Sequence, residues 1–171
     1  MKITPTLIIL TILLFGCSKS SNVTLNGKLT DCPANNTCTY DYYENADFTT
    51  IINQTGTGGY RIFVYESDNK SVCDATISLN FKTAMSANEF TINADQIAAG
   101  QIVKYGFSCT CCDYTLFSVN PQPIGGKIQG KKAGNDTWLI NASIIMGTAP
   151  NKPTDTLVVN QYFTTPFTTK L

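Results

Sequence analysis

Short alternating segments occur along most of this 171-residue chain and constrain its fold more than any other feature. In each of them β-branched or aromatic residues alternate with polar ones, which is the pattern of half-buried strands. The chain contains 24 Thr and 15 Asn, and branched side chains suit a pleated surface whereas Asn suits turns. No segment has the longer period of an extended amphipathic helix. The sequence therefore predicts an all-β domain.

The expected fold is an antiparallel β-sandwich or barrel of about 8 to 11 short strands with at most one short helix. The helix candidate covers 93–100, where Asn93 or Asp95 can cap a turn that Gly100 ends. The strand candidates are 23–30, 38–44, 47–53, 60–66, 73–82, 89–93, 101–109, 114–119, 126–132, 138–146 and 156–163.

The clearest hairpin candidate has a three-residue loop, 134–136. This loop would place Ala133 opposite Thr137 and Ile128 opposite Ala142, so that apolar residues share one face. A two-residue loop would set apolar faces against polar ones. We therefore expect the odd loop length.

The N-terminus has the layout of an export signal. Lys2 precedes an apolar run, and the 14 residues of 3–16 fall short of the roughly 20 that a membrane-spanning helix needs. The quartet Leu14-Phe15-Gly16-Cys17 resembles the lipobox of bacterial lipoproteins, in which the cysteine thiol receives the lipid. The resemblance covers only the first 20 residues. It implies that 1–16 is a signal peptide that is removed and that Cys17 becomes the lipidated N-terminus.

The same resemblance implies a lipidated tether, 17–22, followed by a single β domain over 23–171. Ser18 after the cysteine implies delivery to the outer membrane of a Gram-negative bacterium. The expected location is therefore the cell envelope, with the lipid as the link to the membrane. Because the five residues 18–22 reach about 17 Å at most, we expect the domain to lie close to the bilayer.

Six further cysteines remain, an even number that favours disulfides in an oxidising compartment. Cys32 and Cys38 flank five turn-forming residues, and a bridge that closes this loop is the simplest local solution.

The other four cysteines are Cys73, Cys109, Cys111 and Cys112. If their strands pair antiparallel with Phe81 opposite Val103, Cys73 lies opposite Cys111 and Cys109 can bridge Cys112. The alternative for the cluster from Cys109 to Cys112 is a thiolate site for a soft metal or a redox-active pair.

Charge and histidine content exclude several functions. Twelve Lys and Arg balance 12 Asp and Glu without a block of like charge, so the electrostatic footprint of a nucleic-acid binder is missing. The chain has no histidine, which eliminates Ser-His-Asp and Cys-His catalysis and His-ligated metals. A glycosidase needs only two carboxylates, but the spacing of Glu44, Glu66 and Glu89 brings no two of them together. We expect no catalytic residue, no cofactor and no metal.

The densest aromatic cluster consists of Tyr40, Tyr42 and Tyr43, beside Asp41 and Glu44. Aromatic rings beside carboxylates commonly hold sugar rings, so the three tyrosines are candidate ligand-binding residues. Packing on half-buried strands is the alternative.

Two further side chains are singled out. Trp138 follows the hairpin turn and is expected in the core. The triplet Asp155-Thr156-Leu157 resembles the acceptor site of periplasmic O-glycosylation in some Gram-negative lineages, which makes Thr156 a candidate for modification.

The leading hypothesis is a non-catalytic, membrane-anchored β domain of an envelope lipoprotein that binds a partner protein or a glycan. One alternative is a structural or assembly role without a small ligand. The other is a thiol-based metal or redox protein centred on Cys109–Cys112.

Overall fold

The computed structural model describes residues 25, 27–49, 55–70, 74–110 and 121–166. This part of the chain forms nine strands and one short helix. The predicted strand 114–119 lies outside it. The strands are β1 (Thr37–Phe48), β2 (Thr55–Thr57), β3 (Tyr60–Asn69), β4 (Ala75–Ala84), β5 (Glu89–Ile92), β6 (Val103–Ser108), β7 (Gln122–Gly134), β8 (Thr137–Ala149) and β9 (Lys152–Thr164), and the helix is α1 (Ala94–Ala98).

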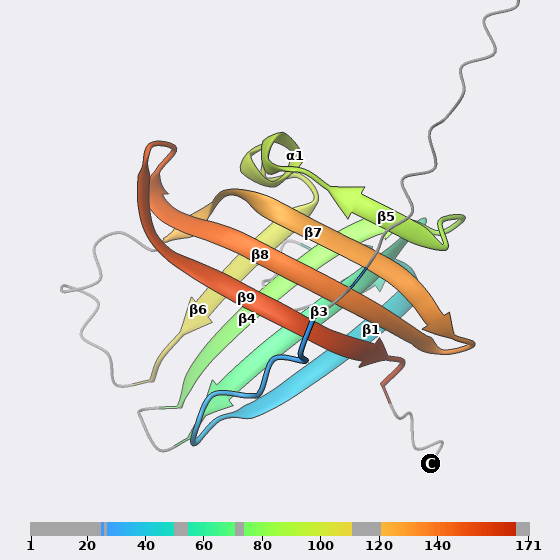
Figure 1. Cartoon of the computed structure of the whole chain (residues 1–171), viewed down its shortest axis with the longest axis horizontal. Coiled ribbons are helices and arrows are strands. Elements are labelled where there is room, and N and C mark those ends of the chain that lie inside the picture. The colour runs from blue at the N-terminus through green and yellow to red at the C-terminus, as the bar shows by residue number, and fades with distance from the viewer. Residues whose placement is uncertain (1–24, 26, 50–54, 71–73, 111–120, 167–171) are drawn as a thin grey trace, which may run out of the picture.

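All nine strands belong to one curled sheet. Its order is β5-β7-β8-β9-β1-β3-β4-β6, with β2 paired to β1. Figure 1 shows how the sheet curls, so that β7, β8 and β9 form one layer that crosses over the layer of β1, β3, β4 and β6. Within the described residues this path ends at β5 and at β6. The all-β prediction is confirmed, and the architecture is a single sheet that curls into an incomplete barrel.

One pair of neighbouring strands departs from the antiparallel prediction. β1 and β9 run parallel and share the single register pair of Asp41 with Thr164. The first long strand of the chain is thus joined to the last one at only one point.

The N-terminal segment, residues 27–31, lies on β9 beside this junction. Thr30 N–H donates to Asn160 O at 2.8 Å, and Asn160 Nδ2 donates to Lys28 O at 2.9 Å. The prediction of a strand over 23–30 is wrong for the described residues, because these bonds form without strand geometry.

β1 continues from the predicted strand 38–44 without a break into the start of the predicted strand 47–53, which is a correction to the sequence-based boundary between them, and residues 50–53 lie outside the described residues. The register against β3 shifts between Tyr43 and Ala46, and Asn45 has a φ of 52°. Asn tolerates this left-handed conformation better than most residues. A β-bulge therefore carries the strand through the polar stretch that suggested a break.

The hairpin of β7 and β8 has the predicted register but a different turn. Ile128 lies opposite Ala142 as expected. The loop prediction is wrong, since Gly134, and not Ala133, pairs with Thr137 and leaves a two-residue turn. A register shift just before Gly134 supplies the extra residue that keeps the apolar faces aligned.

The core lies between the two layers and is built around aromatic rings. The ring centroid of Phe63 lies 5.0 Å from that of Phe81, 5.4 Å from that of Trp138 and 5.8 Å from that of Phe163. All four side chains are buried, which confirms the core placement of Trp138. Aromatic contacts at these distances stabilise a core beyond the area that they bury.

The helix prediction is also confirmed. Asn93 accepts from Gln96 N–H, and the Gln96 side chain accepts from Asn93 N–H, so that a complete capping box starts α1. Ile97 packs into the core from this helix, which fixes α1 over one end of the curled sheet (Figure 1).

Candidate functional site

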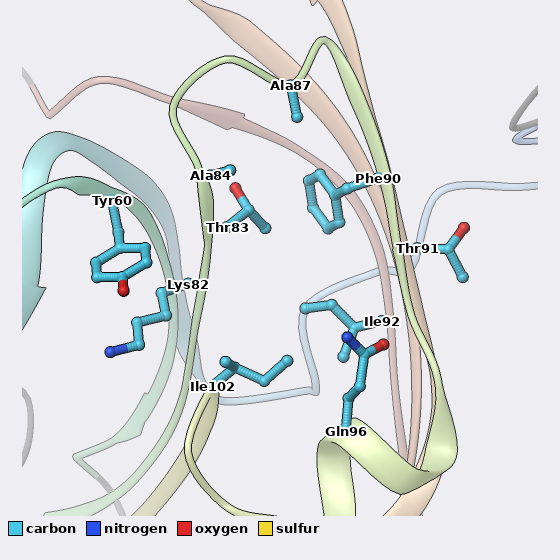
Figure 2. A pocket seen from close by; sticks show the side chains of 10 residues that line it. All are labelled: Tyr60, Lys82, Thr83, Ala84, Ala87, Phe90, Thr91, Ile92, Gln96 and Ile102. Atoms are coloured by element: carbon cyan, nitrogen blue, oxygen red, sulfur yellow. The ribbon is translucent and has the colours of Figure 1, made fainter. Parts of the chain in front are cut away.

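A pocket of about 260 Å³ lies where β4 and β5 separate. We call it the seam pocket (Figure 2). β6 leaves β4 after the pair of Val103 with Phe81, and β5 pairs with β7 instead of β4. The end of β4 therefore faces β5 without a strand between them in the described structure. The volume is slightly below the range of about 300 to 1,000 Å³ that is usual for small-molecule sites.

Most of the wall of the seam pocket is apolar. Figure 2 shows side chains of β4 on one side and of β5 on the other. The apolar lining consists of Ala84, Ala87, Phe90, Ile92 and Ile102. Such a wall favours an apolar group over a strongly hydrated one.

A buried hydroxyl lies in the wall. Thr83 is 8% exposed, and its Oγ1 has no hydrogen-bond partner in the part of the chain that the structure describes. An unsatisfied buried polar group costs about 1 to 3 kcal/mol. A ligand that reaches this hydroxyl with a hydrogen-bonding group would recover that cost.

A cation and an aromatic ring form the outer rim. Lys82 Nζ lies 4.4 Å from the centre of the Tyr60 ring and donates to Asp47 Oδ1 at 2.8 Å. This bond, together with the one from Phe48 N–H, lowers the pKa of Asp47. The ammonium is therefore already compensated, and the rim is close to neutral.

Arg61 holds the turn that shapes the pocket. It is 5% exposed and donates to Ala87 O and to Met85 O, both at 3.1 Å. Its Nη2 also donates to Glu44 Oε1 at 2.8 Å, and its Cζ lies 4.5 Å from the centre of the Trp138 ring. This role of Arg61 was not predicted from the sequence. The signal was present, because Arg61 shares the inward-facing parity of Phe63.

The three candidate tyrosines do not form one site. Tyr40 stacks on Tyr65 with a centroid distance of 5.4 Å, and Tyr42 is 2% exposed beside Phe63. Burial raises the pKa of both phenols. Tyr43 lies on the other face of β1, packed against the cluster that contains Ile62. In this structure Tyr40 and Tyr42 are packing residues, and none of the three lines the seam pocket.

The three glutamates considered for glycosidase chemistry have different surroundings. Glu44 binds Arg61, and Glu89 lies opposite Lys131 on β7. Glu66 has its pKa raised by burial and by the charges of Asp41 and Asp68. The structure gives each glutamate its own neighbours, and none of the three lines the seam pocket.

The disulfide between Cys32 and Cys38 is confirmed, with the Cα atoms 5.8 Å apart. The pairing of β4 with β6 also has Phe81 opposite Val103, as predicted. Cys109 is disulfide-bonded and buried, so it is not a free thiolate. Its predicted partner Cys112, like Cys73 and Cys111, lies outside the described residues.

Two predicted modification sites stay predictions. Cys17 lies outside the described residues. Thr156 is exposed on β9, and its N–H donates to Asp155 Oδ1 at 2.7 Å.

Comparisons with other proteins add no assignment: no family model matches the chain, and neither a curated protein nor a solved structure matches it significantly. Among the described residues, no helix is long and apolar enough to cross a membrane. The same residues contain no group of three or more acidic or cysteine side chains placed to hold a metal ion.

Proposed function

We propose that this protein is a lipid-anchored envelope protein whose β domain binds a partner without catalysing a reaction. The seam pocket carries the proposal, because it combines an apolar wall with the buried hydroxyl of Thr83 that has no partner among the described residues. The apolar wall favours the side chain of a partner protein over the sugar ring of a glycan.

Three observations support the non-catalytic part of the proposal. The chain contains no histidine, Cys109 is held in a disulfide, and the pKa of Asp47, which binds the pocket residue Lys82, is lowered rather than raised. A general base at neutral pH needs a pKa near the working pH. We expect no turnover of esters, peptides, polysaccharides or peptidoglycan.

Filling the pocket tests the binding function. Ala84→Phe places a ring in the seam pocket, whereas Ala133→Phe adds the same ring at an exposed position beside the β7–β8 turn. Screening the wild-type protein against a peptide library and a glycan array identifies ligands. We expect peptide ligands with an apolar side chain, whose Kd rises at least about tenfold, or 1.4 kcal/mol, in Ala84→Phe and not in Ala133→Phe.

Other outcomes assign the function differently. If the wild-type protein binds glycans and Ala84→Phe abolishes that binding, the seam pocket is the binding site but its ligand is a glycan and not a peptide. If neither the peptide library nor the glycan array yields a ligand, the structural or assembly role without a small ligand is favoured.

The lipid anchor has its own test. Replacing Cys17 with Ala should abolish incorporation of radiolabelled palmitate, because the proposed lipid is attached to that thiol. Equal labelling of the variant would refute the anchor.

A further inference from the structure

The geometry points to a second interaction surface on the side of the molecule formed by β7, β8 and β9. We propose that this outer face lies against an anionic phospholipid surface and so fixes the orientation of the domain. The inference rests on the proposed lipid anchor at Cys17. The β7–β9 face consists of the residues on the outward-facing side of these strands, which are Lys127, Gln129, Lys131, Leu139, Asn141, Ser143, Ile145, Thr156, Val158 and Tyr162, together with Gly125 and Asn160, which are buried there.

The chain enters the described structure at the β9 edge of this face, where Thr30 N–H donates to Asn160 O. A Cβ on Gly27 would lie 3.2 Å from Asn160 Nδ2, and Lys28 O accepts a hydrogen bond from the same nitrogen. Asn160 lies between Val158 and Tyr162 on the outward-facing side of β9. The nine residues between Cys17 and Gly27 span at most about 30 Å. A lipid on Cys17 would therefore tether the domain at the edge of the β7–β9 face.

Apolar side chains stand exposed around this entry point. Five large hydrophobic residues of the described chain are exposed, and four of them lie here. They are Leu29 of the N-terminal segment, Ile145, Val158 and Tyr162. Val158 pairs with Ser143 on β8, and Ile145 is two residues further along that strand. Such residues at a bilayer surface bury their apolar parts, and tyrosine is enriched at the headgroup level.

The charges of the face complement anionic lipid. Lys127 and Lys131 lie on the outward-facing side of β7. The outward-facing residues of β7, β8 and β9 include no Asp or Glu, and Asp31 of the N-terminal segment pairs with Lys28 at 3.3 Å. Glu89 on β5 lies opposite Lys131, whereas Lys127 lies opposite Ser143. Each lysine near an anionic membrane surface adds about 1 kcal/mol to the free energy of membrane binding, which is about a fivefold increase in the population of the membrane-bound orientation.

The opposite side of the molecule has the reverse charge. Asp41, Glu66 and Asp68 lie on outward-facing positions of β1 and β3, and burial raises the pKa of Asp41 and Glu66. An acidic face is repelled by an anionic surface. The two sides together select one orientation.

Lysine reactivity tests the orientation on the full lipidated protein. The protein is inserted into vesicles of phosphatidylethanolamine and phosphatidylglycerol and treated with a membrane-impermeant acetylating reagent, and each lysine is quantified by mass spectrometry. We expect Lys127 and Lys131 to react about fivefold more slowly than in neutral detergent. Lys104, exposed on β6 at the opposite side, is the internal control and should react equally in both.

A matched pair of variants keeps the test specific. Lys127→Glu combined with Val158→Asp should abolish the protection of Lys131 in vesicles, while Lys104→Glu should leave it unchanged. Both variants alter exposed positions, and wild-type protein alone already distinguishes the main outcomes.

Each result has one meaning. Vesicle-bound, acylated protein with equally reactive lysines overturns the docking face and leaves the anchor standing. Protein without an acyl group on its N-terminal peptide, which does not float with vesicles, overturns the anchor and the docking face together. Lysines that are protected in native envelopes but reactive in protein-free vesicles show that a protein covers the face, which also overturns the lipid proposal.

Discussion

The two layers of the curled sheet share one core but expose different surfaces. Strands β1, β3, β4 and β6 carry five acidic and three basic side chains, whereas strands β7, β8 and β9 carry one acidic and four basic ones. The formal net charge of zero therefore hides a charge separation between the halves of the fold. Composition alone cannot reveal it, because the separation follows from which strands lie side by side.

The acidic layer also buries more on its outer side. Ile62 is fully buried and Val64 nearly so, in a cluster separate from the main core. Burial raises the pKa of Asp41, and burial with like charge raises that of Glu66. The outer β7–β9 face has no such arrangement in the described structure. The carboxylates of the acidic layer are thus destabilised by burial and like charge, whereas large apolar side chains of the lysine-bearing layer are exposed to solvent.

The largest expected effect comes from breaking the polar link between the layers. Arg61 of β3 contacts Trp138 of β8, Glu44 and two carbonyl oxygens. Arg61→Ala should lower the free energy of unfolding by about 3 kcal/mol, because hydrogen bonds to charged groups contribute about 1.5 to 3 kcal/mol each and are only partly replaced by water. Urea denaturation measures the loss. A loss below about 1 kcal/mol would contradict this role, and Arg61→Lys, which keeps the charge without the planar fork, should fall in between.

The next effect has the opposite sign. Glu66→Gln removes one of several close like charges from the acidic layer and should stabilise the protein at pH 7 by up to about 1 kcal/mol. The raised pKa means that the folded state binds more protons than the unfolded one, so wild-type stability falls as pH rises through this range. The gain from Glu66→Gln should vanish below about pH 4, where both states are protonated. Thermal unfolding at pH 7 and pH 3.5 checks both halves of the prediction.

Asp47 provides a contrast on the same layer. Its pKa is lowered by the bonds from Lys82 and Phe48, so the stability that it contributes is present above its unfolded pKa and is lost as pH falls through the folded one. Asp47→Asn should cost about 0.5 kcal/mol at pH 7, as for a partly exposed ion pair. The cost should diminish below about pH 4. An increase in stability at pH 7 would show that the ion pair is not formed in solution.

The smallest effect is expected on the other layer. Lys127→Gln changes an exposed lysine whose cross-strand neighbour is Ser143, so the free energy of unfolding should change by less than about 0.5 kcal/mol. The same variant should weaken protection of Lys131 on anionic vesicles. A clear loss of stability would mean that Lys127 serves the fold and not a surface.

Much of the fold follows from period-two alternation. It placed Phe81 opposite Val103 and Ile128 opposite Ala142, because a slip of one residue would turn every apolar side chain outward. The short helix and the disulfide between Cys32 and Cys38 were predictable for a similar reason, because each depends only on residues that are close in the sequence. Two of the errors lie at bulges, where Asn45 and the residue before Gly134 add a residue that the alternation does not predict. The third is the strand predicted over 23–30, where the described residues bond to β9 without forming a strand.

The candidate site was not predictable in the same way. The seam pocket exists because β5 pairs with β7 rather than with β4, and that choice depends on strands far apart in the sequence. The tyrosine cluster is divided by the strand itself, since adjacent residues on a strand point to opposite faces. Tyr42 and Tyr43 were therefore bound to be separated.

The parallel contact between β1 and β9 sets an order of events for folding. The pair of Asp41 with Thr164 and the bond from Thr30 to Asn160 both require the final strand, so the sheet is not complete until almost the entire chain is available. Contacts of such long sequence separation slow folding, because loop closure precedes any gain from pairing. β1 already pairs with β3 along most of its length. What awaits β9 is therefore the closure of the curled sheet at the β1–β9 junction, and not the pairing of the first strand.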